Sequence, residues 1–169
     1  MHQDIPPEQR LAELIGRARE GGMMLVLLGL GNELRGDDAV GTVLARDLSA
    51  LGLPGLKSFP VGISVENSTH LVARHGARIM LLVDAVSEPG RPLGHWDFHP
   101  PENLDSFIHS THSVPLSLFV TFWKREVPDL EVHFIGINIG PTETFGEMCR
   151  EVRETKENLI RAFRAGLEV

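Results

Sequence analysis

Residues 23–47, MMLVLLGLGNELRGDDAVGTVLARD, decide the fold of this chain. The stretch begins with an unbroken apolar run at residues 23–28 and then turns on closely spaced glycines. Short apolar runs bounded by glycine are typical of strands that are buried on both faces, as in a parallel sheet. From Val40 onward the apolar residues recur at the spacing of a helix with one buried face. The stretch therefore predicts a strand, a tight loop and a helix.

Two carboxylates, Asp37 and Asp38, stand between this loop and the helix. Asp37 is expected to be the N-cap, because its side chain can accept the free N–H groups of the first turn. Asp38 then falls in the first turn, where the helix dipole stabilises a negative charge. The motif therefore places two carboxylates at the edge of the predicted sheet.

Strands and helices alternate along the rest of the chain. Further strands are predicted at residues 56–61, 78–83, 93–98 and 130–137, and helices at residues 6–20, 64–74, 114–124 and 144–167. This order predicts an α/β fold, a three-layer α/β/α sandwich with a mainly parallel, twisted five-stranded sheet and helices on both faces. Residues 1–22 are expected to form an appended N-terminal helix, and residues 23–169 a single domain.

Details of single elements can also be predicted. The run 78–83 is strongly apolar, so we expect it to be the central strand and to end on Asp84, whereas 93–98 is expected at an edge. Ser64 is expected to cap the helix that follows it. In the helix at residues 6–20, one apolar stripe is expected to cover the core: Leu11, Leu14, Ile15 and Ala18. In the helix at residues 114–124, three apolar residues share one side: Val114, Leu118 and Phe122.

The composition is that of an ordinary globular protein of 169 residues, with 42% apolar and 23% charged residues. No apolar run approaches the roughly 20 residues that cross a bilayer, so we expect no membrane insertion. A signal-peptide pattern is not visible and one cysteine forms no intrachain disulfide, so a cytoplasmic protein is expected. The net charge of −7 disfavours a nucleic-acid partner, because phosphate binding depends on Lys and Arg. A monomer is expected.

Three residues form a candidate metal site. Open α/β sheets bind ligands beyond the carboxyl ends of their strands, where Asp38 and Asp84 are expected. His112, immediately before a predicted helix, is a possible third ligand, and this mixed oxygen and nitrogen set suits Ni²⁺ or Zn²⁺. Spacing alone favours a plainer interpretation, in which the carboxylates cap a helix or form a turn and His112 only begins a helix.

The glycine loop and the single cysteine each suggest another kind of site. The glycine loop resembles the start of a dinucleotide-binding fingerprint, but its third glycine, Gly36, comes two places late. The carboxylates that follow it would also repel a pyrophosphate, so an organic cofactor is not expected. Cys149 has no partner thiol in the chain and is expected to be a buried, inert residue rather than a nucleophile.

Four stretches resemble segments of the hydrogenase maturation proteases, the endopeptidases that trim the C-terminus of the large subunit of nickel–iron hydrogenases. They are GLGNELRGDDAVG at residues 29–41, GISVEN at 62–67, LLVDAV at 81–86 and STHSVPLSLF at 110–119. The resemblance implies that Asp38, Asp84 and His112 are the metal ligands and form the active site. Some members carry Glu at the position of Asp38, and the helix before residue 23 is an addition.

The resemblance also implies a partner and a metal. The partner is the hydrogenase large-subunit precursor, and the nickel belongs to that substrate rather than to the protease. The metal could polarise the scissile carbonyl or activate water, with a carboxylate as general base. Two alternatives stay open: a nickel carrier without catalytic activity, and a peptidyl-tRNA hydrolase. The latter family also opens with Gly-Leu-Gly-Asn but expects a T-R-H-N segment, where this chain has DDAVG.

Overall fold

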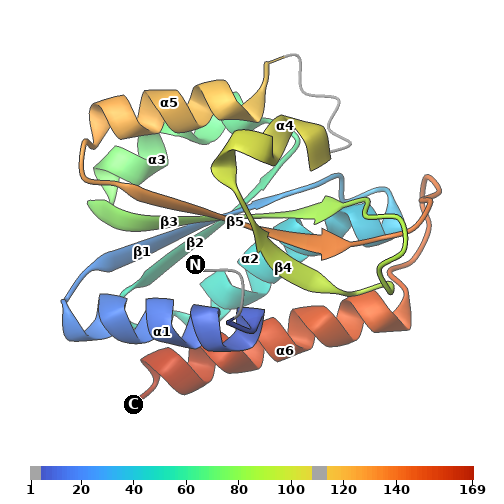
Figure 1. Ribbon diagram of the computed structural model, residues 1–169, viewed down its shortest axis with the longest axis horizontal. Coiled ribbons are helices and arrows are strands. Elements are labelled where there is room, and N and C mark those ends of the chain that lie inside the picture. Colours follow the sequence, from blue (N-terminus) through green and yellow to red (C-terminus); the bar gives the residue numbers. More distant parts are fainter. Residues whose placement is uncertain (1–4, 108–113) are drawn as a thin grey trace.

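The computed structural model describes residues 5–107 and 114–169. A central sheet lies between two layers of helices, with α3, α4 and α5 over one face and α1, α2 and α6 over the other (Figure 1). The predicted three-layer α/β/α sandwich is therefore confirmed.

The sheet has five strands in the order β2-β1-β3-β5-β4. Neighbouring strands are parallel except for β4, which is antiparallel to β5. The predictions that the third strand is central and the fourth lies at an edge are confirmed. The bounds are Met24–Leu30 (β1), Leu56–Gly62 (β2), Ala77–Val86 (β3), Trp96–His99 (β4) and Glu131–Asn138 (β5).

Six α-helices and three 3-10 turns connect and cover the strands in the described part of the chain. The α-helices are Pro7–Glu20 (α1), Val40–Leu51 (α2), Thr69–Arg74 (α3), Leu104–Phe107 (α4), Leu116–Glu126 (α5) and Arg150–Leu167 (α6). The 3-10 turns are Gly36–Ala39 (η1), Val65–Ser68 (η2) and Pro101–Asn103 (η3). Within the described ranges, no helix has both the length and the apolar character that crossing a bilayer requires.

Three expectations for the helices were wrong. The last helix begins at Arg150 rather than at residue 144, so residues 144–149 belong to a loop. Ser64 makes no side-chain cap, and the segment after it divides into η2 and α3. Asp37 is not the cap of α2, because it lies inside η1 and its carboxylate binds elsewhere.

The core has two parts, one on each face of the sheet. Val83 and Ala85 of β3 pack on the α1, α2 and α6 side, whereas Leu82 and Val86 pack on the α3 and α5 side. Because successive side chains of a strand face opposite ways, Asp84 lies on the same face as Leu82 and Val86. The stripe of α1 belongs to the first part of the core, as predicted: Leu11, Leu14, Ile15 and Ala18 are all buried.

Helix α5 turns its bulkiest residue inward. Trp123 is fully buried, and its Nε1 donates a hydrogen bond of 3.1 Å to the carbonyl of Thr69, where α3 begins. Leu116 and Val120 are buried on the same side. The opposite side, which carries Leu118 and Phe122, faces solvent. The indole therefore fixes which of the two apolar sides of this helix contacts the sheet.

Candidate active site

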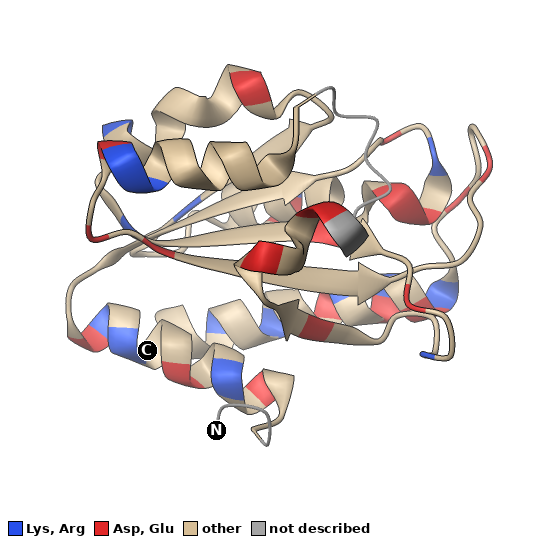
Figure 2. Ribbon diagram, turned by 45° about the horizontal axis from the view of Figure 1, so that its top comes forward, with Lys and Arg blue, Asp and Glu red and all other residues tan. Residues whose placement is uncertain are grey.

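The carboxyl ends of the four parallel strands lie at one edge of the sheet, at the right of Figure 1. The loop of residues 31–39, called the Asp38 loop below, follows β1 at this edge and ends in the 3-10 turn η1. In Figure 2 its acidic segment lies at the same edge, while positive and negative residues are interspersed along α1 and α6. This edge is where open α/β sheets form their ligand sites.

Glycine lets the Asp38 loop fold back onto the end of β1. Gly31 has φ +130°, and a Cβ at this position would lie 1.9 Å from the carbonyl oxygen of Asp38. No side chain fits so close to another backbone segment. The carbonyl of Gly31 also accepts a hydrogen bond of 3.0 Å from the hydroxyl of Thr42 in α2. The close approach of the two backbone segments therefore places Asp38 beside the carboxyl end of β1.

Asp38 is half-buried, and its Oδ2 accepts a hydrogen bond of 3.0 Å from the backbone N–H of Asn32. This bond closes the loop across six residues and orients the carboxylate. Asp37, its neighbour, is turned the other way: its Oδ1 accepts a hydrogen bond of 2.7 Å from the backbone N–H of Cys149. The two adjacent carboxylates therefore have different surroundings.

Asp84 lies inside β3 and not at its end, because the strand continues through Ala85 to Val86. Its side chain is buried, and Oδ1 accepts a hydrogen bond of 2.8 Å from the N–H of Ala85. Burial raises the pKa of Asp84 well above its ordinary value, and the negative charge of Asp38 raises the pKa further. The structure therefore brings Asp38 and Asp84 close enough for their charges to interact.

His112, the third residue of the predicted site, lies outside the described residues. Among the residues that are described, no three His, Cys, Asp or Glu side chains are grouped as a metal site. Two neighbouring carboxylates whose charges interact are nevertheless suited to binding a hard or borderline cation, or to moving a proton.

A buried histidine and a half-buried glutamate, which were not expected from the sequence, lie near Asp84. His99 of β4 is buried, and its Nδ1 lies 3.9 Å from Oε1 of Glu88. The imidazole covers Gly136, the residue opposite Asp84 in β5, where a Cβ would come within 2.7 Å of the ring. Burial lowers the pKa of His99. The signal in the sequence is the glycine inside the strand FIGIN, which marks a close approach.

Cys149 is half-buried rather than fully buried, and it precedes α6. Burial, together with the nearby carboxylate of Asp37, raises the pKa of its thiol. A raised pKa keeps the sulfur protonated, so the geometry gives no support to a nucleophilic role.

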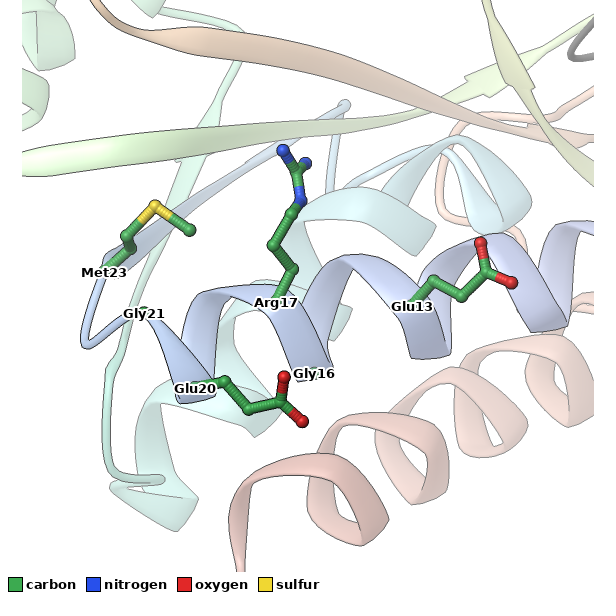
Figure 3. A pocket seen from close by; sticks show the side chains of 6 residues that line it. All are labelled: Glu13, Gly16, Arg17, Glu20, Gly21 and Met23. Atoms are coloured by element: carbon green, nitrogen blue, oxygen red, sulfur yellow. The ribbon is translucent and has the colours of Figure 1, made fainter.

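A pocket at the other end of the sheet does not contain these carboxylates. It is lined by the last turns of α1 and the start of the chain toward β1 (Figure 3): Glu13, Gly16, Arg17, Glu20, Gly21 and Met23. Its one cationic side chain, Arg17, is held by two hydrogen bonds of 2.7 and 2.6 Å to the carboxylate of Glu131. Since this guanidinium is already paired, it is not free to bind an anionic ligand in the pocket.

Comparison with known proteins gives a consistent result. No protein-family model matches the chain. Hydrogenase 3 maturation protease of Escherichia coli K12 is 25% identical over 136 residues, which cover 80% of this chain and 86% of the relative. The crystal structure of the [NiFe] hydrogenase maturation protease HycI from Thermococcus kodakarensis KOD1 is similar with a TM-score of 0.76 and 26% identity, over 87% of this chain and 94% of that one.

A second solved structure, of the endopeptidase HycI from Escherichia coli, is similar with a TM-score of 0.71 and 25% identity, over 82% of this chain and 88% of that one. The similarity in each case spans most of both chains. Sequence relatives and solved structures agree with the motifs: the chain is similar in sequence and fold to the hydrogenase maturation proteases, and it is a peptidase.

Proposed function

We propose that this protein is the endopeptidase that removes the C-terminal extension of a nickel–iron hydrogenase large-subunit precursor after nickel has been inserted. We further propose that it recognises the nickel of the precursor. The observation that carries the proposal is the pair of Asp38 and Asp84: burial raises the pKa of Asp84, and the negative charge of Asp38 raises it further. A divalent cation would compensate both charges.

Asp38, Asp84 and His112 are the proposed ligands of this substrate-borne metal. Two carboxylates and an imidazole form a set that nickel accepts. Asp38 reaches the metal from the loop after β1, and Asp84 from the central strand, so two rigidly held elements supply the carboxylates. His112 precedes α5 in the sequence. Its place in the proposal depends on the resemblance of the stretch STHSVPLSLF, residues 110–119, to the protease family.

Hydrolysis then requires few steps from the chain itself. A water molecule attacks the carbonyl carbon of the scissile peptide bond, and the C–N bond breaks as the nitrogen takes up a proton. The nickel of the substrate can polarise that carbonyl or the water. A carboxylate of the site accepts the proton of the water and returns it to the leaving amine. Because its pKa is raised, Asp84 holds a proton more readily than an ordinary carboxylate does.

The same charges explain why an immature precursor would be rejected. Without nickel, Asp38 and Asp84 remain uncompensated and repel each other, so docking an empty precursor over them buries two unpaired charges. With nickel, the charges that opposed docking become ligands. Discrimination therefore depends on a penalty against the wrong substrate as well as on contacts with the right one. We place this reaction in the cytoplasm.

The experiment is to mix the purified protein with nickel-loaded or nickel-free precursor and to record the masses of both products. We expect one cut, near the C-terminus, in the loaded precursor only. Asp38→Asn, Asp84→Asn and His112→Ala should each abolish it. Asp129→Asn is the matched control, because Asp129 is an exposed acid that pairs with Arg78 far from the site.

Cleavage without nickel would contradict the recognition proposal, and wild-type cleavage by Asp38→Asn would contradict the assigned site. Tight binding of Ni²⁺ by the protein alone, with no peptide released, would instead indicate a nickel carrier. Titration calorimetry separates that outcome, because the proposal predicts weak binding of free Ni²⁺.

A further inference from the structure

Asp37 does not cap a helix, and the contacts around it suggest another role. The Asp38 loop lies against the segment of residues 142–149, which joins β5 to α6. The carbonyl of Leu34 accepts a hydrogen bond from the N–H of Phe145, and the guanidinium of Arg35 donates one of 3.3 Å to the carbonyl of Thr142. The hydrogen bond from the N–H of Cys149 to Asp37 is the shortest side-chain contact between the two segments, at 2.7 Å.

The contact at Asp37 is buried and tightly packed. The exposed fraction of Asp37 is 9%. Beside it, Gly36 has φ +55°, and a Cβ there would lie 3.0 Å from the carbonyl oxygen of Glu147. The two backbone segments are therefore in direct contact, and the Asp37 carboxylate bridges them where they meet.

The partner of Asp37 is a rigid element. Cys149 is the residue that precedes α6, an 18-residue helix whose inner face is buried in the core under the sheet. An N–H at the start of a helix has no acceptor within that helix, so a carboxylate satisfies it well. The hydrogen bond therefore attaches the Asp38 loop to the start of a well-packed helix.

We propose that Asp37 is a positioning residue: its hydrogen bond to the N–H of Cys149 fixes η1 against the start of α6 and thereby holds the Asp38 carboxylate in place opposite Asp84. The inference rests on the proposed function, because it takes Asp38 to be a residue of the active site. η1 has four residues, so a shift at Asp37 moves Asp38 with it.

The hydrogen bond can be removed from either side with a matched control for each. Asp37→Ala removes the acceptor, whereas Asp37→Asn keeps an oxygen that can accept the same N–H. Cys149→Pro removes the donor at a residue whose φ of −67° already suits proline, which fixes φ near −65°. Cys149→Ala removes the thiol and keeps the donor.

We expect Asp37→Ala and Cys149→Pro each to lower kcat for the nickel-loaded precursor by about tenfold to a hundredfold, because small misplacements of catalytic groups have effects of this size. KM should change little, because Asp37 itself does not contact the substrate. Asp37→Asn and Cys149→Ala should stay within about threefold of wild type, since a neutral acceptor replaces most of one hydrogen bond. The double variant Asp37→Ala, Cys149→Pro should be no worse than either single variant.

A second readout does not depend on cleavage. The amide resonance of Asn32 reports the position of Asp38, because this N–H donates to the Asp38 carboxylate. It should shift in Asp37→Ala and Cys149→Pro and stay in place in the two controls. If the wild-type protein fails to cleave, the proposed function is wrong. The Asn32 resonance still shows whether the hydrogen bond between Cys149 and Asp37 holds Asp38 in place.

Two results would overturn the inference. An Asp37→Ala variant with wild-type kcat and an unmoved Asn32 resonance would show that the bond holds nothing in place. An Asp37→Asn variant as inactive as Asp37→Ala would show that the charge of Asp37 acts, and not its hydrogen bond. If Cys149→Pro does not fold, the comparison of the two Asp37 variants gives the answer alone.

Discussion

Replacing Asp84 by Asn is expected to make the metal-free protein more stable while abolishing its activity. Asp84 is buried in the central strand, and the pKa of its carboxyl is raised by burial and by the charge of Asp38. Above the ordinary value of 3.8, keeping this carboxyl in its buried site therefore opposes folding. Asparagine has nearly the same shape, keeps an oxygen for the N–H of Ala85, and carries no charge.

The expected size follows from the surroundings of the carboxylate. Its hydrogen bond to the N–H of Ala85 survives the substitution, so the gain comes from removing a buried, poorly compensated charge, about 1–3 kcal/mol in mutational data. The sign with pH can be stated. A carboxyl whose folded-state pKa is raised contributes stability below its unfolded pKa and loses that contribution as pH rises through the folded pKa. The advantage of Asp84→Asn should therefore be largest at neutral pH and vanish toward the ordinary value of 3.8.

The assay is urea denaturation of chelator-treated protein, followed by circular dichroism, at a series of pH values from near the ordinary value of 3.8 upward to neutral. Asp97→Asn is the matched control. Asp97 accepts a hydrogen bond from the next N–H in the same way, at 2.7 Å, but it is only half-buried. The free energy of unfolding of the Asp97→Asn variant should therefore differ little from that of wild type. An Asp84→Asn variant that is less stable than wild type at neutral pH would refute the reasoning.

Three more outcomes are expected. Gly31→Ala should lower the free energy of unfolding by about 1–3 kcal/mol, because its Cβ would overlap the carbonyl of Asp38. Gly90→Ala is the control in the same urea assay: Gly90 has φ +88° and free space around it, so this variant measures only the cost of the backbone conformation. Phe145→Asn should raise stability by about 1 kcal/mol, because Phe145 is 79% exposed at φ +62°, a conformation that Asn adopts more easily; an increased KM in the same variant would show that the ring contacts the precursor. His133→Gln should reduce the loss of stability in acid, because burial lowers the pKa of His133. The stabilising contribution of the neutral imidazole is present above the ordinary value of 6.5 and is lost as pH falls. Urea midpoints at about pH 7 and about pH 5 measure the difference between the variant and wild type.

The sheet was predictable because its signal is local. The strands β1 and β3 are apolar runs, and β3, the longer of the two, is flanked on both sides by other strands. Burial on two faces leaves no polar alternation, so apolar runs of this kind indicate a central position. The edge strand β4 was shorter than expected, Trp96–His99 rather than 93–98, because its pairing with β5 spans only those residues.

The caps were not predictable, because the partners of the capping residues are distant in sequence. Asp37 has the residue type and the position expected of an N-cap. Its carboxylate instead accepts a hydrogen bond from the N–H of Cys149, 112 residues away. The same contact explains the late start of α6. Residues 142–149 contact the Asp38 loop, and this loop geometry prevents the helix from extending further toward β5. Local propensity is a weak prior where a tertiary contact competes with it.

The site was predictable only in part. That Asp38 and Asp84 lie at the same edge follows from parallel strands, whose carboxyl ends meet. That Asp84 is buried two residues before the end of its strand does not follow from the sequence, and neither does the buried His99 beside it. Both depend on β5, where Gly136 leaves room for the imidazole across from Asp84.

Asp84 and Asp38 are held in place by different kinds of contact. Asp84 is fixed by the hydrogen bonds of the central strand and cannot adjust to its ligand. Asp38 belongs to a loop, so the distance between the two carboxylates is set by whatever holds that loop. In this protein the hydrogen bond from Cys149 to Asp37 and the close contact at Gly36 hold it. Because the two charges repel, the loop would relax away from Asp84 without these contacts. Under the proposed function the site is empty until a metal-bearing substrate binds, so the contacts that hold the loop must lie on groups that the metal does not touch.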